Sequence, residues 1–78
     1  MPRFIVEAIK FTGNDREVLA FCPGARDPED SKPNLIIPTP HGERLVSVGD
    51  YVVKVATLPT VYYVVDGTVF EAIAKREL

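Results

Sequence analysis

His41 and Cys22 are the side chains of this sequence that could act as a base or a nucleophile. A histidine works as a general base only when a nucleophile or a carboxylate is held close to it. His41 sits in a Pro-His-Gly turn with only Glu43 near it, and we interpret it as an exposed turn residue. Cys22 follows an expected helix, whose dipole disfavours a thiolate at that end. We therefore predict a packed or half-buried, unreactive thiol and no catalytic residue.

The sequence also lacks the motifs that hold metals and phosphates. It contains no zinc-type Cys/His spacing, no glycine-rich phosphate loop and no paired-carboxylate motif. A small enzyme would need convergent titratable groups, and the sequence shows none. We expect no metal, no cofactor and no enzymatic activity.

Binding is the chemistry that the sequence favours. Tyr62 and Tyr63 are adjacent in an expected strand, so one ring should face the core and the other the surface. An exposed tyrosine can anchor a partner protein or stack on a nucleobase, and strand-borne cations could meet a phosphate. The alternative is that the cations protect sheet edges from aggregation. The predicted binding residues are Tyr51, Tyr62, Tyr63, Lys10, Arg44 and Lys54, with Phe70 as a further aromatic neighbour.

The size and charge of the chain limit the number of domains it can form and the kinds of partner it can bind. The 78 residues suffice for a single small domain, residues 1–78, and the lone cysteine cannot form an internal disulfide. Because partner chains often stabilise so small a core, we expect a homodimer.

The net charge of −2 argues against a nucleic-acid partner. No apolar run reaches the roughly 20 residues that span a bilayer, and no signal peptide follows Met1, so we expect a cytoplasmic protein with no membrane partner.

A sheet must position the predicted binding residues. Apolar runs separated by short polar turns predict a central β-meander: residues 35–37, residues 45–55 with Gly49-Asp50 as an internal turn, and residues 61–65. His41-Gly42 is the expected two-residue turn after the first run, because glycine supplies positive φ. We predict an α+β fold with a small, mostly antiparallel sheet of four or five strands.

The amino-terminal segment predicts a strand followed by a short helix. Apolar side chains on both faces of residues 3–11 indicate a central strand. Asn14 followed by Glu17 is a helix-start signature, and the helix should end at Cys22-Pro23-Gly24. The helix residues expected to face the core are Val18, Leu19 and Cys22.

Two segments allow alternative interpretations. The polar residues 25–34 form either a solvated connection or a functional loop that orders on binding. Asp66-Gly67 predicts a hairpin, whereas Thr68 followed by Glu71 predicts a helix start before apolar residues at helical spacing. We favour a terminal helix from Val69 to about Glu77.

The chain contains four short motifs, each of which occurs once: VEAIKFTG at 6–13, LIIPT at 35–39, VGDYVVK at 48–54 and FE at 70–71. With these motifs the chain resembles a family of small proteins encoded by bacteriophages and prophages, whose members share "EAxxFTG", "LIIPT", "GDYxxK" and "FE". The resemblance covers most of the chain except the loop at 25–32. Residues 61–65 lack the glycine, cysteine and prolines that relatives often place there.

The resemblance implies a setting, namely a phage product in the cytoplasm of its bacterial host. Small phage proteins outside the virion are commonly host-takeover or counter-defence factors. The family thus implies a non-catalytic protein that inhibits a bacterial immune protein by direct binding or sequesters a nucleotide-like immune signal. Its partner would be a bacterial host protein or a small nucleotide-like ligand. The alternative is a minor virion or assembly protein.

Asp50 belongs to the shared "GDY" motif, which invites a catalytic interpretation. An aspartate in a turn commonly accepts hydrogen bonds from its own backbone and tolerates unusual φ angles. We therefore favour a structural role for Asp50.

Overall fold

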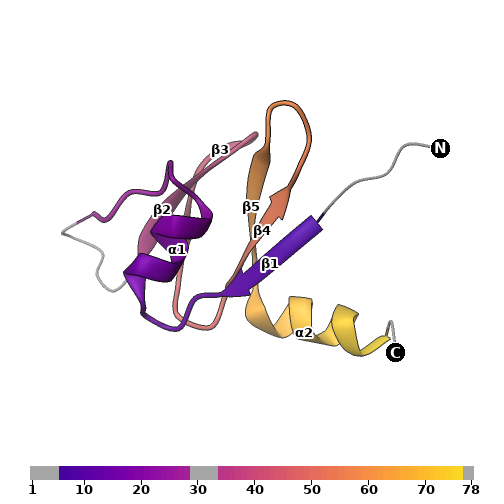
Figure 1. Ribbon diagram of the computed structural model, residues 1–78. Helices are drawn as coiled ribbons and strands as arrows, with labels where there is room; N and C mark the ends of the chain where they lie inside the picture. The colour runs from indigo at the N-terminus through magenta and orange to yellow at the C-terminus, as the bar shows by residue number, and fades with distance from the viewer. Residues whose placement is uncertain (1–5, 29–33, 77–78) are drawn as a thin grey trace.

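The computed structural model describes residues 6–28 and 34–76. Within these residues the chain is α+β, as the sequence predicted, and no helix is long and apolar enough to cross a membrane. The elements in chain order are β1 (Val6–Lys10), α1 (Asp15–Phe21), β2 (Leu35–Thr39), β3 (Gly42–Val46), β4 (Tyr51–Val55), β5 (Val61–Val65) and α2 (Gly67–Arg76) (Figure 1).

The described strands form two antiparallel ladders, so the predicted single sheet with a continuous meander is wrong. One ladder has the order β1-β4-β5 and the other is the hairpin β2-β3. Because β1 and β5 occupy both edges of β4, β3 cannot pair with it. The chain leaves β3 through a turn in which Gly49 has a φ of +100° and the Asp50 N–H donates to the Ser47 carbonyl at 2.9 Å. This turn directs the chain from one ladder into the other.

β1 lies at an edge of its ladder and not at the predicted centre. It pairs with β4 from Val6↔Val55 to Lys10↔Tyr51. Its outward apolar side chains are exposed, and Val6 is 59% exposed. The apolar alternation of residues 3–11 therefore does not reflect burial on both faces; residues 3–5 lie outside the described residues.

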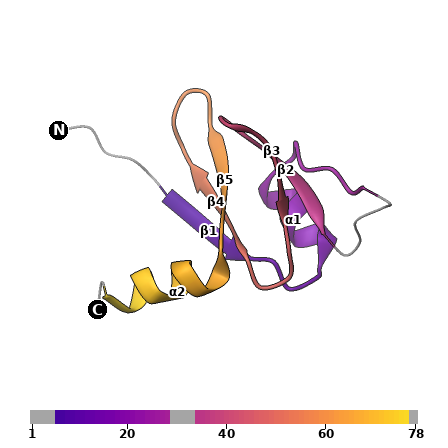
Figure 2. The ribbon, with the colours of Figure 1, turned by 180° about the vertical axis from the view of Figure 1, so that it is seen from behind.

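The hydrophobic core lies between the two ladders, with α1 beside the hairpin and α2 at the opposite side of the molecule (Figure 2). Among the predicted inward residues of α1, Val18 and Cys22 are fully buried, but Leu19 is 39% exposed. A helix of seven residues presents only a narrow face, and positions four apart share it. The buried residues of the core are Phe11, Val18, Cys22, Ala25, Leu35, Ile37, Val46 and Val52.

Local signals in the sequence explain how both helices begin. The Asn14 side chain accepts a hydrogen bond from the Arg16 N–H at 3.1 Å, as the predicted cap requires. A terminal helix forms and the hairpin alternative does not, but α2 begins at Gly67 and not at the predicted Val69, and the predicted end at Glu77 lies outside the described residues. The cap of α2 is Asp66 and not Thr68, because the Asp66 carboxylate accepts from the N–H groups of Thr68 at 2.9 Å and Val69 at 3.2 Å.

A junction of backbone groups and one carboxylate joins β1, the turn before β4 and α2. The Phe11 N–H donates to the Asp50 carbonyl at 2.8 Å, and the Gly49 N–H donates to the Phe11 carbonyl at 2.8 Å. The Asp50 carboxylate accepts from the N–H groups of Ser47 at 3.2 Å and Gly67 at 3.3 Å. Both oxygens of Asp50 thus bind backbone, in agreement with the structural role that the sequence favoured.

Gly67 should not tolerate a side chain at this junction. A Cβ atom at Gly67 would clash with the Gly49 carbonyl oxygen. Alanine in an unobstructed helix stabilises by up to about 1 kcal/mol relative to glycine. We expect the opposite sign for Gly67→Ala, a loss of about 1–3 kcal/mol in the free energy of unfolding, measured by urea denaturation. Thr68→Ala, at the exposed next position, should change stability by less than about 0.5 kcal/mol. A Gly67→Ala variant as stable as the parent would contradict the packing.

Candidate functional site

The tip of the β2–β3 hairpin holds His41 in a fixed position. Thr39 pairs with Gly42, so the turn residues are Pro40 and His41 and not the predicted His41-Gly42. The Thr39 hydroxyl donates to the Gly42 carbonyl at 2.6 Å and accepts from the His41 N–H at 3.2 Å. Gly42 has a φ of +101°, a conformation that glycine adopts without strain. The hairpin tip is therefore well braced by one hydroxyl.

Strand alternation sends the neighbours Glu43 and Arg44 to opposite faces of the hairpin. Glu43 accepts from Arg26 at 2.6 Å and 3.0 Å, and Arg26 is held there by its backbone pairing with Ile36. Arg44 pairs in register with Ile37, on the face that carries the core. Its guanidinium donates at 3.1 Å to the Glu43 carbonyl and has no carboxylate partner among the described residues. No carboxylate of the described residues therefore compensates the charge of Arg44.

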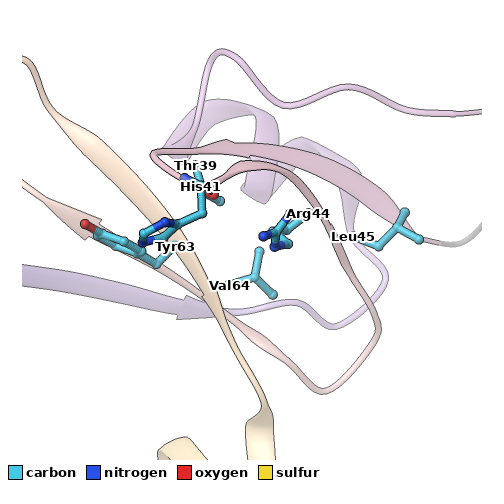
Figure 3. Close-up of a pocket in the computed structure, with 6 residues that line it drawn as sticks. All are labelled: Thr39, His41, Arg44, Leu45, Tyr63 and Val64. Atoms are coloured by element: carbon cyan, nitrogen blue, oxygen red, sulfur yellow. Dashed lines mark hydrogen bonds between the residues drawn. The ribbon is translucent and has the colours of Figure 1, made fainter.

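A groove lies between this hairpin and β5, and we call it the hairpin groove. Its volume is about 250 Å³, and it is lined by Thr39, His41, Arg44, Leu45, Tyr63 and Val64. In Figure 3 the rings of His41 and Tyr63 lie at one end and Arg44 lies above Val64. Tyr63 and Val64 are neighbours on β5 and face opposite sides, so the groove follows the free edge of that strand.

The lining of the hairpin groove suits binding of an anion. A guanidinium binds phosphate or carboxylate through two parallel hydrogen bonds, and aromatic rings stack on planar groups. The described lining includes no carboxylate that could compete for Arg44 or orient His41 as a base. The groove therefore offers a positive charge, two rings and the apolar side chain of Val64.

The structure places the predicted binding residues Tyr51 and Lys10 elsewhere, against α2. The Tyr51 ring stacks on Phe70 with centroids 4.0 Å apart. The Tyr51 hydroxyl at 3.0 Å and the Lys10 ammonium at 3.2 Å both donate to the same oxygen of Glu71. These contacts attach α2 to the three-stranded ladder, which gives both residues a structural role.

The other two predicted binding residues, Lys54 and Tyr62, lie in a third place, on the inner face of the three-stranded ladder. The Lys54 ammonium lies 5.6 Å from the centre of the Phe21 ring, and Tyr62 meets the same ring edge-on at 6.2 Å. Tyr62 packs against the core, whereas Tyr63 lies on the opposite face, as expected for adjacent strand residues. A second cavity, of about 290 Å³, is lined by Pro38, Thr39, Pro40, Thr60, Val61 and Tyr62.

Of the six predicted binding residues, the hairpin groove brings together Arg44 and Tyr63. Sequence reasoning did not assign His41 to the site, because its proximity to Tyr63 arises from the passage of β5 beside the hairpin. No local motif carries that information. The predicted loop at 25–34 is described only in part: Ala25 is buried, Arg26 pairs with Ile36, and residues 29–33 lie outside the described residues.

The outer face of the three-stranded ladder is apolar and has no helix across it in either view (Figures 1 and 2). We call it the outer sheet face. Register and strand alternation place on it Val6, Ala8, Val53, Val55, Val61, Tyr63 and Val65, with Lys10 and Tyr51 at one end. α2 contacts only one end of this face, through Tyr51.

Comparison of the chain with protein-family models, curated proteins and solved structures finds no match. The resemblance to small phage proteins therefore stays a prediction.

Cys22 should react slowly with thiol reagents. Its side chain is fully buried. Burial raises the pKa of the thiol, an effect that hydrogen bonds from the backbone N–H groups of Gly24 and Ala25 partly oppose. Because the thiolate is the reactive form, we expect slow labelling of the native protein by a disulfide reagent at neutral pH and immediate labelling in denaturant. Rapid labelling of the native protein would contradict this burial.

The attachment of α2 should weaken at alkaline pH. The hydrogen bonds and the negative charge of Glu71 raise the pKa of Lys10 above 10.5 and that of Tyr51 above 10.0. Groups whose pKa is higher in the folded state stabilise the fold below their unfolded pKa and lose that effect as the pH rises through the folded pKa. We expect thermal stability to fall above about pH 10. In Glu71→Gln this alkaline loss should shrink; an identical profile in parent and variant would contradict the assignment.

Proposed function

We propose that this protein is a non-catalytic binding protein of phage origin that acts in the cytoplasm of a bacterial host. It counters a bacterial defence by occupying an immune protein or by sequestering a nucleotide-like signal. The observation that supports binding is the hairpin groove, where Arg44, which has no carboxylate partner in the described part of the chain, lies beside the rings of His41 and Tyr63. The phage setting rests on the resemblance of the four sequence motifs.

The roles of the other candidate residues also favour binding over chemistry. The carboxylates of Asp50 and Asp66 cap backbone groups, and Glu43 pairs with Arg26. The thiol of Cys22 is buried and has a raised pKa. These groups are engaged in the fold, whereas Arg44 remains available to a ligand.

We further propose that a second copy of the chain covers the outer sheet face. The charged groups beside this face, Lys10 and Glu71, pair with each other, so two copies can meet without like-charge repulsion. Tyr63 belongs to both the outer sheet face and the hairpin groove, so a second copy there would also enclose the open side of the groove. A core of this size gains stability from such burial.

Light scattering coupled to size-exclusion chromatography tests the homodimer. We expect a dimer at high concentration for the parent and a shift toward monomer for Val53→Thr, which keeps the shape and strand propensity but adds a hydroxyl to the outer sheet face. Thr68→Val, a change of the same size away from this face, should leave the dimer intact. A parent that stays monomeric at all concentrations would overturn this proposal.

Native mass spectrometry of the protein purified from bacterial cells tests the proposed function. We expect either a stoichiometric complex with a host protein or an added mass of nucleotide size. Arg44→Gln should reduce the retained partner, and Arg16→Gln, an exposed arginine outside the groove, should not. A bare protein in this spectrum, together with its presence in purified phage particles, would contradict the binder and support the virion protein instead.

A further inference from the structure

We propose that the hairpin groove binds an organic anion in which a phosphate and a planar ring are joined by a short linker, as the ribose joins them in a mononucleotide. The phosphate contacts Arg44, and the ring lies against Tyr63 and His41. This inference rests on the proposed function, because it names the class of ligand that the binding protein takes.

The charge pattern around the groove supports binding of the phosphate group. Lys10 and Arg26 are paired with carboxylates, and Lys54 lies over the Phe21 ring. Arg44 instead lines a groove with no carboxylate among its described lining residues. Since the chain as a whole carries a net charge of −2, this positive site is a local feature and not part of a basic surface. A single anionic group is the ligand that such a site selects.

The orientation of Arg44 suits a phosphate. Its Nη1 atom donates to the Glu43 carbonyl at 3.1 Å, which holds the guanidinium in place and leaves its other N–H groups for a ligand. A guanidinium that is already positioned loses less conformational entropy on binding. Glu43 itself cannot compete, because its carboxylate is held by Arg26 on the other face of the hairpin.

The rings of Tyr63 and His41 support binding of the planar ring of the ligand. Tyr63 lies on the face of β5 that points away from the core, and its hydroxyl has no partner among the described residues. The Thr39 hydroxyl holds the backbone of His41 at the hairpin tip, and the His41 ring lines the groove there. Aromatic side chains in such positions stack on bases regardless of base identity, because every base has a π-face. We therefore expect weak discrimination among bases.

The volume of the groove limits the ligand. Pockets for drug-sized ligands measure about 300–1,000 Å³, and the hairpin groove measures about 250 Å³. It is therefore small for a nucleotide, and the ligand contacts it through one ring and one phosphate, with Val64 beside Arg44. A mononucleotide should consequently bind better than either inorganic phosphate or a free nucleoside.

Isothermal titration calorimetry with adenosine monophosphate, inorganic phosphate and adenosine tests the proposal. We expect adenosine monophosphate to bind at least about tenfold more tightly than either fragment. Arg44→Gln should lower its affinity about tenfold or more, and so should Tyr63→Leu, which keeps an apolar side chain but removes the ring. Arg16→Gln is the matched control, because it removes an equal charge outside the groove and should change the affinity less than twofold. Equal melting temperatures of Arg44→Gln and the parent would show that the loss is not unfolding.

The outcomes separate this inference from the proposed function. No binding of adenosine monophosphate, or equal losses in Arg44→Gln and Arg16→Gln, would overturn the mononucleotide site. If a host protein then co-purifies in native mass spectrometry, the binding protein stands and only its ligand class is wrong. If adenosine monophosphate binds as expected but the protein resides in phage particles, the site stands and the counter-defence function fails.

Discussion

The pair of backbone hydrogen bonds between Phe11 and the Gly49-Asp50 turn is the constraint on which the rest of this structure depends. It fixes the end of β1 to the point where the chain leaves the hairpin for β4. Phe11 is thereby held in the core, between residues of both ladders. The Asp50 carboxylate extends the same junction to Gly67 and so sets where α2 begins. Because β5 lies beside β4, this junction also determines where β5 passes the hairpin.

The hairpin groove is a consequence of that arrangement. The core is filled where Leu35, Ile37 and Val46 of the hairpin meet Phe11, directly after β1, and Val52 of β4. Toward the hairpin tip the apolar positions give way to Arg44 and His41 while β5 continues alongside, and the space between them stays open. Alternation along β3 directs Arg44 into this space and sends Glu43 to Arg26 on the other side. The cationic character of the groove follows from strand geometry and requires no basic surface.

Local features of this protein could be predicted from its sequence, and pairings between distant segments could not. The Asn14 cap, the terminal helix, the backbone role of Asp50 and the buried thiol of Cys22 each follow from short-range chemistry. The division into two ladders does not, because apolar alternation indicates burial but not which strands pair. The edge position of β1 was missed for a related reason: its outer side chains are as apolar as those of a central strand. Arg44 and Tyr63 were expected in a site, but their meeting with His41 depends on that non-local pairing.

The most direct test of the hairpin groove as a ligand site is a titration of the ¹⁵N-labelled protein with adenosine monophosphate, followed by two-dimensional NMR. We predict saturable chemical-shift changes in the backbone amides of Thr39, of residues 41–45 and of residues 61–65, and in the side-chain Nε–H of Arg44. Amides of α1 and of the Gly49-Asp50 turn should remain unchanged. Absence of saturable shifts, or shifts confined to residues outside these two segments, would contradict the assignment of the groove.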